Sequence, residues 1–490
     1  MDRNKRVSTG IRGLDDILKG GLFAGRSYLL VGSSGTGKTI FSIQFLLEGA
    51  RKGEKSVFIS LAESLNNIRK DIEAFDWDTG GIVMREVLFA EGDRDDEVGE
   101  YSIFYPNEVE NLSVWKEIYE IVREEKPDRL VIDSATQLRY ISQDEFQFRK
   151  QILNFIRLLD KLHSTAILTF EPIELEQDIS LSLEVDGIIR LRREISSGRI
   201  VELRSVEIEK LRGSGYMDAL HPFRITDEGI VIFPHYIEKA EGNVPGAETL
   251  NSGIDGLDEL LASGIESGTT TIISGPTGIG KTTLGMQFLV SAARSGKKGI
   301  FYTFEESVES IVKRCSSIGI DVERMIEKGT LIGVRVNPME LYPDEFSAMI
   351  KGDIEKKGCR VVMIDSLRGY QLAMEQFGSL AANIQNIVTY LNGKNVTTFV
   401  INEVESITGD LKLTELGVSY VMDNAILLRF AEVDGRIVRV IGSLKKRLSG
   451  FKPELREFEV TGKGLEVGKK IEGLEGVLRG VPERRIERGD

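Results

Sequence analysis

The chain has 490 residues, with 63 Lys and Arg against 77 Asp and Glu, and a net charge of −14. At about 100–200 residues per domain, this length indicates two to four domains, and the acidic balance argues against nucleic acid as a partner. No apolar run reaches the length of a membrane span, and the start MDRNKRVSTG lacks the apolar stretch of a secretory signal. The only cysteines, Cys315 and Cys359, exclude a disulfide framework, so we expect a cytoplasmic protein.

The first patterned region is a short apolar run, a glycine-rich loop and a helix. Residues 28–31 predict a buried strand, and residues 39–50 have apolar side chains at helical spacing. Between them, GSSGTGKT at 32–39 fits G-x-x-x-x-G-K-[ST] in the strand–loop–helix context that this motif requires. Its glycines allow backbone N–H groups to surround a phosphate, and the helix N-terminus adds a positive dipole. We therefore expect Lys38 to reach the β- and γ-phosphates of ATP and Thr39 to bind Mg²⁺.

Three further apolar runs predict buried strands at 57–61, 128–133 and 165–170. Because they alternate with helical segments, we expect an α/β fold with a parallel sheet covered on both faces and ligands at the carboxyl ends of its strands. Asp133 ends one strand, where a carboxylate can hold the water shell of Mg²⁺ or merely cap the next turn. Glu63 follows another strand and is either a base that activates water or a solvated helix-cap acid.

A basic strand follows in RSVEIEKLRGS at 204–214. Strand alternation places Lys210 and Arg212 on one face, with Arg204 six residues before the lysine. Such a face could complete the phosphate site of a neighbouring subunit, as an arginine finger does. The alternative is a set of exposed strand charges that prevent pairing at a sheet edge.

The chain then repeats itself. TGIRGLDDILKGG at 9–21 matches SGIDGLDELLASG at 252–264, and the shift of 243 positions continues to GPTGIGKT at 275–282. Later the shift is 232, because the strand ending in Asp133 matches the one ending in Asp365, so the first copy has about 11 additional residues. They belong near the acidic segment 91–111, which is either a solvated loop or a site for a protein partner.

We therefore predict a tandem duplication with a first domain at 1–237, a second at 246–468 and a charged tail at 469–490, itself a candidate contact for protein partners. The boundary near 234–249 is rich in Pro, Gly and polar residues. These domains are called the first copy and the second copy below.

The second copy differs from the first in its acids. The strand GIFYTF ends in Glu305 and Glu306, whereas the aligned positions in the first copy are Ala62 and Glu63. If the first acid of the pair is the stronger base, the first copy should hydrolyse ATP slowly and act more as a scaffold. We therefore expect the second copy to be the better catalyst.

The candidate site residues fall into three groups. The nucleotide-contacting residues are Gly32, Gly35, Thr36, Gly37, Lys38, Thr39, Gly275, Thr277, Gly278, Ile279, Gly280, Lys281, Thr282 and Thr283. The catalytic acids are Glu63, Glu305 and Glu306, and the metal-binding residues are Thr39, Asp133, Thr282 and Asp365. The residues that would contact a neighbouring subunit are Arg204, Lys210, Leu211, Arg212, Ser214, Arg439, Lys445, Lys446, Arg447 and Ser449.

Together these features resemble the KaiC family of the RecA-like ATPase superfamily over nearly the whole chain. The resemblance rests on T/S-G-I-x-G-L-D, both glycine loops, the acid pair, both I-D-S strand ends, both Lys-x-Arg segments and GVP at 480–482. It implies two RecA-like domains, hexameric rings that act as regulatory switches, and ATP bound between adjacent subunits. It also implies catalysis by the acid pair and contact across the interface by Lys-x-Arg.

In the clock ATPases of this family, the second domain autophosphorylates a Ser-Thr pair. Here Ser419 falls on the Ser and Tyr420 on the Thr, while Thr414 matches an upstream Thr. The complete pair is therefore absent, and Ser419, with Glu305 as the base, is the candidate phosphorylation site that the resemblance leaves.

Two other functions share these features. A DNA-dependent ATPase of the RecA or helicase kind has the same fold, and its ATPase activity would rise with single-stranded DNA in a salt-dependent way. The acidic balance and the lack of an added DNA-binding module argue against it. A nucleotide-dependent scaffold would bind ATP with negligible turnover, which phosphate release from Lys38→Ala and Lys281→Ala variants would reveal.

Overall fold

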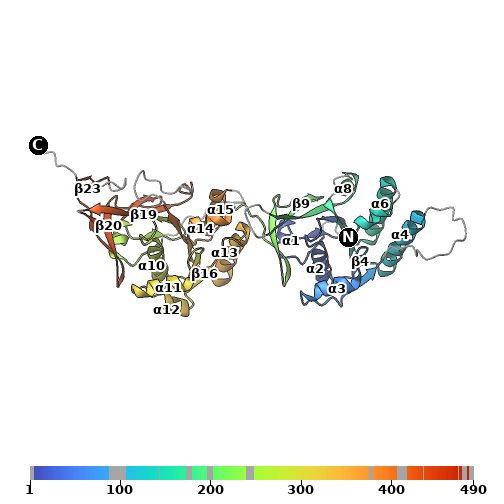
Figure 1. The fold of residues 1–490 in the computed structure, drawn as a ribbon, viewed down its shortest axis with the longest axis horizontal. Helices are drawn as coiled ribbons and strands as arrows, with labels where there is room; N and C mark the ends of the chain where they lie inside the picture. Colours follow the sequence, from blue (N-terminus) through green and yellow to red (C-terminus); the bar gives the residue numbers. More distant parts are fainter. Residues whose placement is uncertain are drawn as a thin grey trace. The chain divides into compact units, whose positions relative to one another are not determined.

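The computed structural model describes residues 5–87, 106–142, 144–172, 179–195, 202–238, 248–374, 379–404, 417–433, 435–472, 474–476 and 483–484. It divides into two compact units, Met1–Tyr236 and Ile237–Asp490, which are described separately (Figure 1). Of the acidic segment at 91–111, only residues 106–111 are described, at the start of a helix. Thr414 and the GVP at 480–482 lie outside the described residues.

The first unit is built on a nine-stranded sheet in the order β5-β4-β6-β7-β3-β8-β9-β10-β11. The six strands from β5 to β8 in this order run parallel, and β9, β10 and β11 extend the sheet antiparallel. The strands are β3 (Ser27–Val31), β4 (Ser56–Ser60), β5 (Ile82–Glu86), β6 (Arg129–Asp133), β7 (Thr165–Phe170), β8 (Gly187–Ile195), β9 (Glu202–Leu211), β10 (His221–Thr226) and β11 (Gly229–Ile232).

Helices cover both faces of this sheet. One buried core contains Phe41 and Phe45 of α2, and a second, on the other face, contains Trp115 of α4 and Phe155 of α6. The helices are α1 (Leu14–Ile17), α2 (Lys38–Arg51), α3 (Leu65–Glu73), α4 (Pro106–Glu125), α5 (Thr136–Tyr140), α6 (Glu145–Leu162) and α8 (Ile179–Glu184). The predicted parallel sheet with two covered faces is therefore confirmed.

The second unit repeats this topology strand for strand, in the order β16-β15-β17-β18-β14-β19-β20-β21-β22. The strands are β14 (Thr270–Gly275), β15 (Gly299–Thr303), β16 (Leu331–Arg335), β17 (Val361–Asp365), β18 (Thr397–Glu403), β19 (Asn424–Val433), β20 (Arg436–Lys446), β21 (Leu455–Thr461) and β22 (Gly464–Lys470). The helices are α9 (Asp255–Leu260), α10 (Lys281–Arg294), α11 (Val308–Ser317), α12 (Val322–Glu327), α13 (Pro343–Lys357), α14 (Leu367–Met374) and α15 (Leu380–Gly393). Two tandem α/β domains of RecA-like topology result.

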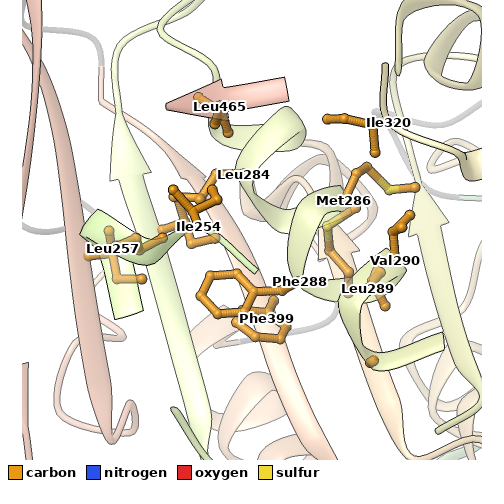
Figure 2. Packing of buried hydrophobic residues seen from close by; sticks show 14 of the residues in the cluster. Ile254, Leu257, Leu284, Met286, Phe288, Leu289, Val290, Ile320, Phe399 and Leu465 are labelled. Carbon is orange, nitrogen blue, oxygen red and sulfur yellow. The ribbon is translucent and has the colours of Figure 1, made fainter. Parts of the chain in front are cut away.

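The core of the second unit forms around α10. Phe288 on this helix stacks on Phe399 of β18 with ring centroids 4.6 Å apart, and Leu257 of α9 and Leu465 of β22 belong to the same cluster (Figure 2). Such aromatic pairs add to the stabilisation from buried apolar area. This packing holds the helix that follows the glycine loop against the central strands.

Short strand pairs accompany each sheet: β1 (Arg6–Val7) with β2 (Leu22–Phe23), β12 (Thr249–Leu250) with β13 (Ile265–Glu266), and β23 (Leu474–Glu475) with β24 (Glu483–Arg484) in the tail. Within the described ranges, the helices are all too short or too polar to cross a membrane.

Candidate phosphate-binding sites

Each glycine loop connects a central strand to the helix that follows it. Gly35 and Gly37 have φ values of 75° and 101°, and Gly278 and Gly280 have values of 75° and 114°, so all four lie in the left-handed region. A Cβ on Gly32 would lie 2.5 Å from Oγ1 of Thr36, which leaves no room for a side chain. The loops are thus closely packed cradles of backbone at helix N-termini, which suits a phosphate group.

The loop lysines are held differently in the two copies. Lys38 Nζ donates to the carbonyl oxygen of Ser33 (3.2 Å) and pairs with Glu171 (2.8 Å), whereas Lys281 Nζ donates to the carbonyl oxygen of Pro276 (2.9 Å). Burial lowers the pKa of Lys281, although Glu403 and other carboxylates oppose this shift. Both ammonium groups lie at the cradles, as the sequence predicts.

Glu171 and Glu403 were not identified from the sequence. Glu171 directly follows β7, and Glu403 ends the equivalent strand β18, where its carboxylate accepts a hydrogen bond from Oγ1 of Thr277. The signal was present, because TAILTFE and TTFVINE align with the same shift of 232 positions as the aspartates. Each cradle therefore has an acid at the carboxyl end of the strand next to its own.

The predicted metal-binding residues lie together in both copies. Oγ1 of Thr39 donates to Asp133 over 2.7 Å, and Oγ1 of Thr282 donates to Asp365 over the same distance. Burial raises the pKa of Asp365 to about 6, an effect that the hydroxyl of Thr282 opposes. Hydroxyl and carboxylate oxygens are the ligands that Mg²⁺ prefers, so the residues present fit this ion.

The two acids of the second copy face different partners. Glu305 accepts a hydrogen bond of 2.6 Å from Oγ of Ser366, whereas Glu306 pairs with Arg314 at 2.6 Å. Both acids line one cavity of about 340 Å³ with the loop residues, including Lys281. The cavity thus brings together the predicted cradle, metal residues and acids of the second copy.

The single acid of the first copy lies among other carboxylates. Burial raises the pKa of Glu63, and the charges of Asp71 and Asp133 raise it further.

The Lys-x-Arg side chains contact carbonyl oxygens of their own copy. Lys210 Nζ donates to the carbonyl oxygen of Ser182 over 2.6 Å, and Arg212 donates to that of Leu183. In the second copy, Lys445 Nζ donates to the carbonyl oxygen of Ser419 (3.1 Å) and of Met422 (2.6 Å), and Arg447 donates to that of Tyr420 (2.6 Å). Each pair thus contacts one segment of its own copy, which in the second copy is the turn that contains Ser419.

The remaining candidate interface residues are placed as follows. The side chains of Leu211 and Lys446 are buried, and Lys446 Nζ donates to the carbonyl oxygens of Leu261 (2.7 Å) and Gly264 (2.8 Å). Both side chains thus pack inside their own copy. Arg204 pairs with Glu202, Arg439 is half-buried on β20, and Ser214 and Ser449 lie in turns where each donates to the next carbonyl oxygen.

One further cation lies beside a cradle. A Cβ on Gly35 would lie 2.9 Å from Nη1 of Arg193, which ends near the first glycine loop and pairs with Glu202. No motif marks this arginine in the sequence, since Phe430 occupies the equivalent position in the second copy.

Comparison with known proteins identifies the family of this chain. The family model described as "ATPase: KaiC" matches the chain twice, at residues 7–237 and 250–472. Similar proteins include the circadian clock oscillator protein KaiC of Prochlorococcus marinus subsp. pastoris, 28% identical over 98% of this chain and 94% of the relative. The circadian clock protein KaiC3 of Synechocystis sp. is also 28% identical (98% and 95%), and the KaiC of Thermostichus vulcanus is 29% identical (98% and 92%). Two matches in register with the two structural units show that this chain belongs to the KaiC family of ATPases.

Proposed function

We propose that each copy binds ATP with Mg²⁺ and hydrolyses it slowly, and that the chain acts as a regulatory switch. The observation that carries this proposal is the cavity of the second copy, where the glycine loop, the Thr282–Asp365 pair and Glu305 meet. The first copy supplies the same cradle and metal pair, with Glu63 in place of the Glu305–Glu306 pair.

The residues have separate roles in this proposal. Backbone N–H groups and Lys281 hold the β- and γ-phosphates, and Thr282 and Asp365 hold Mg²⁺, which neutralises phosphate charge when bound. Glu305 orients a water molecule and accepts its proton as the water oxygen bonds to the γ-phosphorus. The bond from the γ-phosphorus to the bridging oxygen then breaks, and ADP and inorganic phosphate are the products.

The proposal extends to an assembly. The family resemblance is the support for a ring, for which we propose a hexamer with ATP at subunit interfaces and with Lys210, Arg212, Lys445 and Arg447 completing a neighbour's pocket. These side chains use part of their donor capacity on their own carbonyl oxygens, and lysine and arginine have donors to spare. Ser419 is the proposed autophosphorylation site, with Glu305 as the base.

Phosphate release by the full chain with MgATP tests the proposal. We expect the Lys38→Ala and Lys281→Ala variants each to bind one nucleotide fewer per chain, and the double variant to bind none. Lys281→Ala should lose more turnover than Lys38→Ala, because the second copy has Glu305. Lys52→Ala, an exposed lysine just after α2, is the control.

Failure of the wild-type chain to retain any adenine nucleotide in the presence of Mg²⁺ would refute this function. Mass mapping after incubation with γ-labelled ATP, with Ser419→Ala as the control, tests the phosphorylation separately.

A further inference from the structure

A charge reversal separates the two copies beside their catalytic acids. Asp71 on α3 and Arg314 on α11 occupy equivalent positions, eight residues after Glu63 and Glu306 respectively. Both helices begin at the same place, with a serine N-cap whose side chain accepts a backbone hydrogen bond. The difference therefore lies in the side chains and not in the helices that carry them.

In the second copy, Arg314 forms an ion pair with the carboxylate of Glu306. Nη1 of Arg314 lies 2.6 Å and 2.8 Å from the two carboxylate oxygens, and Oγ of Ser310 donates to one of them over 2.8 Å. The three residues are four positions apart, so they share one face of the chain as it enters the helix. Glu305 is outside this ion pair and instead bonds to Ser366, beside the metal residue Asp365.

In the first copy, the residue at the position of Arg314 carries a negative charge. Asn67 and Asp71 take the positions of Ser310 and Arg314, so the acid has a carboxylate where its counterpart has a guanidinium. Among the hydrogen bonds and ion pairs within the described parts of the chain, none holds the Glu63 carboxylate. The charged groups that act on it are Asp71, from its own helix, and Asp133, from β6.

We propose that the residue at this helix position determines which carboxylate can activate water. Arg314 holds Glu306 in an ion pair and leaves Glu305 as the acting base, whereas Asp71 leaves Glu63 available in a copy that has Ala62 in place of the first acid. Arg314 and Asp71 are thus positioning residues. The inference rests on the proposed ATP hydrolysis, and it leaves Glu305 as the usable member of the Glu305–Glu306 pair.

The first test places an arginine in the first copy. In full chains that contain Lys281→Ala, so that only the first copy turns over, Asp71→Arg should clamp Glu63. We expect kcat to fall about a hundredfold, the contribution typical of a positioned base, with the MgATP dissociation constant unchanged. Glu73→Arg, an exposed position on the same helix, makes the same charge change away from Glu63 and is the control. A kcat for Asp71→Arg equal to that of the control would overturn the proposal.

The second test transfers the first-copy arrangement to the second copy. In chains that contain Lys38→Ala, Glu305→Ala should lose about a hundredfold in kcat. Adding Arg314→Asp reproduces the Ala62, Glu63 and Asp71 set and should restore kcat by about tenfold or more. Adding Lys313→Asp instead, an exposed neighbour with the same charge change, should restore nothing.

The proposed ATP hydrolysis and the positioning role of Arg314 and Asp71 can be refuted separately. Absence of phosphate release from both single-copy parents would refute the proposed function. Active parents that bind MgATP, combined with no rescue by Arg314→Asp, would refute the positioning role alone. Because Asp71→Arg and the transferred set are read in different domains, misfolding of one variant leaves the other decisive.

Discussion

At the scale of single residues, the first copy contains a buried arginine that the second copy lacks. Arg129 at the start of β6 is fully buried, pairs with Glu54 and donates to the backbone carbonyl oxygens of Ser8 and Phe45. A Cβ on Gly49 would lie 2.5 Å from Cδ of Arg129, so glycine makes room for this side chain. In the second copy, Val361 stands in place of Arg129 and Ala292 in place of Gly49. The smaller strand residue is thus matched by a larger helix residue.

We predict that Gly49→Ala destabilises the first copy by about 1–3 kcal/mol, the usual effect of overpacking. The variant Gly49→Ala with Arg129→Val, which recreates the second-copy pair, should be more stable than Gly49→Ala alone. Urea unfolding followed by tryptophan fluorescence measures this, because Trp77 and Trp115 are the only tryptophans and both lie in the first copy. Equal midpoints for the single and double variants would show that the two positions are not coupled.

The sequence predicts site residues most directly where the chemistry is local. Lys38 and Thr39 follow from one motif, because the loop and the helix N-terminus that place them are contiguous in the chain. The pairing of Glu306 with Arg314 depends on a helix face, and the approach of Arg193 to Gly35 depends on distant strands. The four-residue spacing of Glu306, Ser310 and Arg314 is visible in the sequence, but it does not show which acid Arg314 pairs with. The approach of Arg193 to Gly35 has no spacing that a single sequence would reveal.

At the scale of elements, the two copies join equivalent strands by different chemistry. In the second copy, the ammonium of Lys446 on β20 is buried and pairs with Glu266 of β13 at 3.1 Å. The equivalent residues in the first copy are Leu211 and Phe23, both in its hydrophobic core. An ion pair in one copy thus replaces an apolar contact in the other.

We predict that Lys446→Leu destabilises the second copy by about 3–5 kcal/mol, because it leaves a buried carboxylate without its partner. Adding Glu266→Phe, which restores the apolar pair of the first copy, should recover most of that loss. Both cysteines, Cys315 and Cys359, are buried in the second copy, so the rate of thiol labelling in urea reports its unfolding. If the cysteines of the double variant are labelled as fast as those of Lys446→Leu, the apolar pair does not replace the ion pair.

The predicted elements agree with the structure where apolar runs are continuous. The runs at 28–31, 57–61, 128–133 and 165–170 became β3, β4, β6 and β7 with ends shifted by at most one residue. Of the antiparallel extension, the sequence predicts only the Lys-x-Arg strand, β9. Its side chains are mostly half-buried and it lacks a continuous apolar run, so the alternation of its residues is the only signal. Topology at that edge is set by pairing between strands, which a single sequence does not show.

At the scale of the whole molecule, two similar glycine-loop cradles on one chain raise the question of whether a neighbouring subunit completes each of them. The cradle, the metal pair and the acid of a pocket come from a single copy. Lys210 and Arg212 instead contact the carbonyl oxygens before β8, and we propose that they also serve a neighbour. A ring of identical subunits would allow every pocket to be completed this way.

Mixed assemblies test this proposal. All chains contain Lys281→Ala, so only first-copy turnover is measured. One chain adds Lys38→Ala and the other adds Lys210→Ala with Arg212→Ala, and each alone should be inactive. Co-expressed at equal levels, they should regain activity at about a quarter of the interfaces, where an intact cradle meets an intact Lys-x-Arg segment. Replacing the second chain by one with Asp133→Ala should give no recovery, since Asp133 and Lys38 belong to the same pocket. If the first mixture is also inactive, Lys210 and Arg212 act within their own copy, and their hydrogen bonds to Ser182 and Leu183 are their whole role.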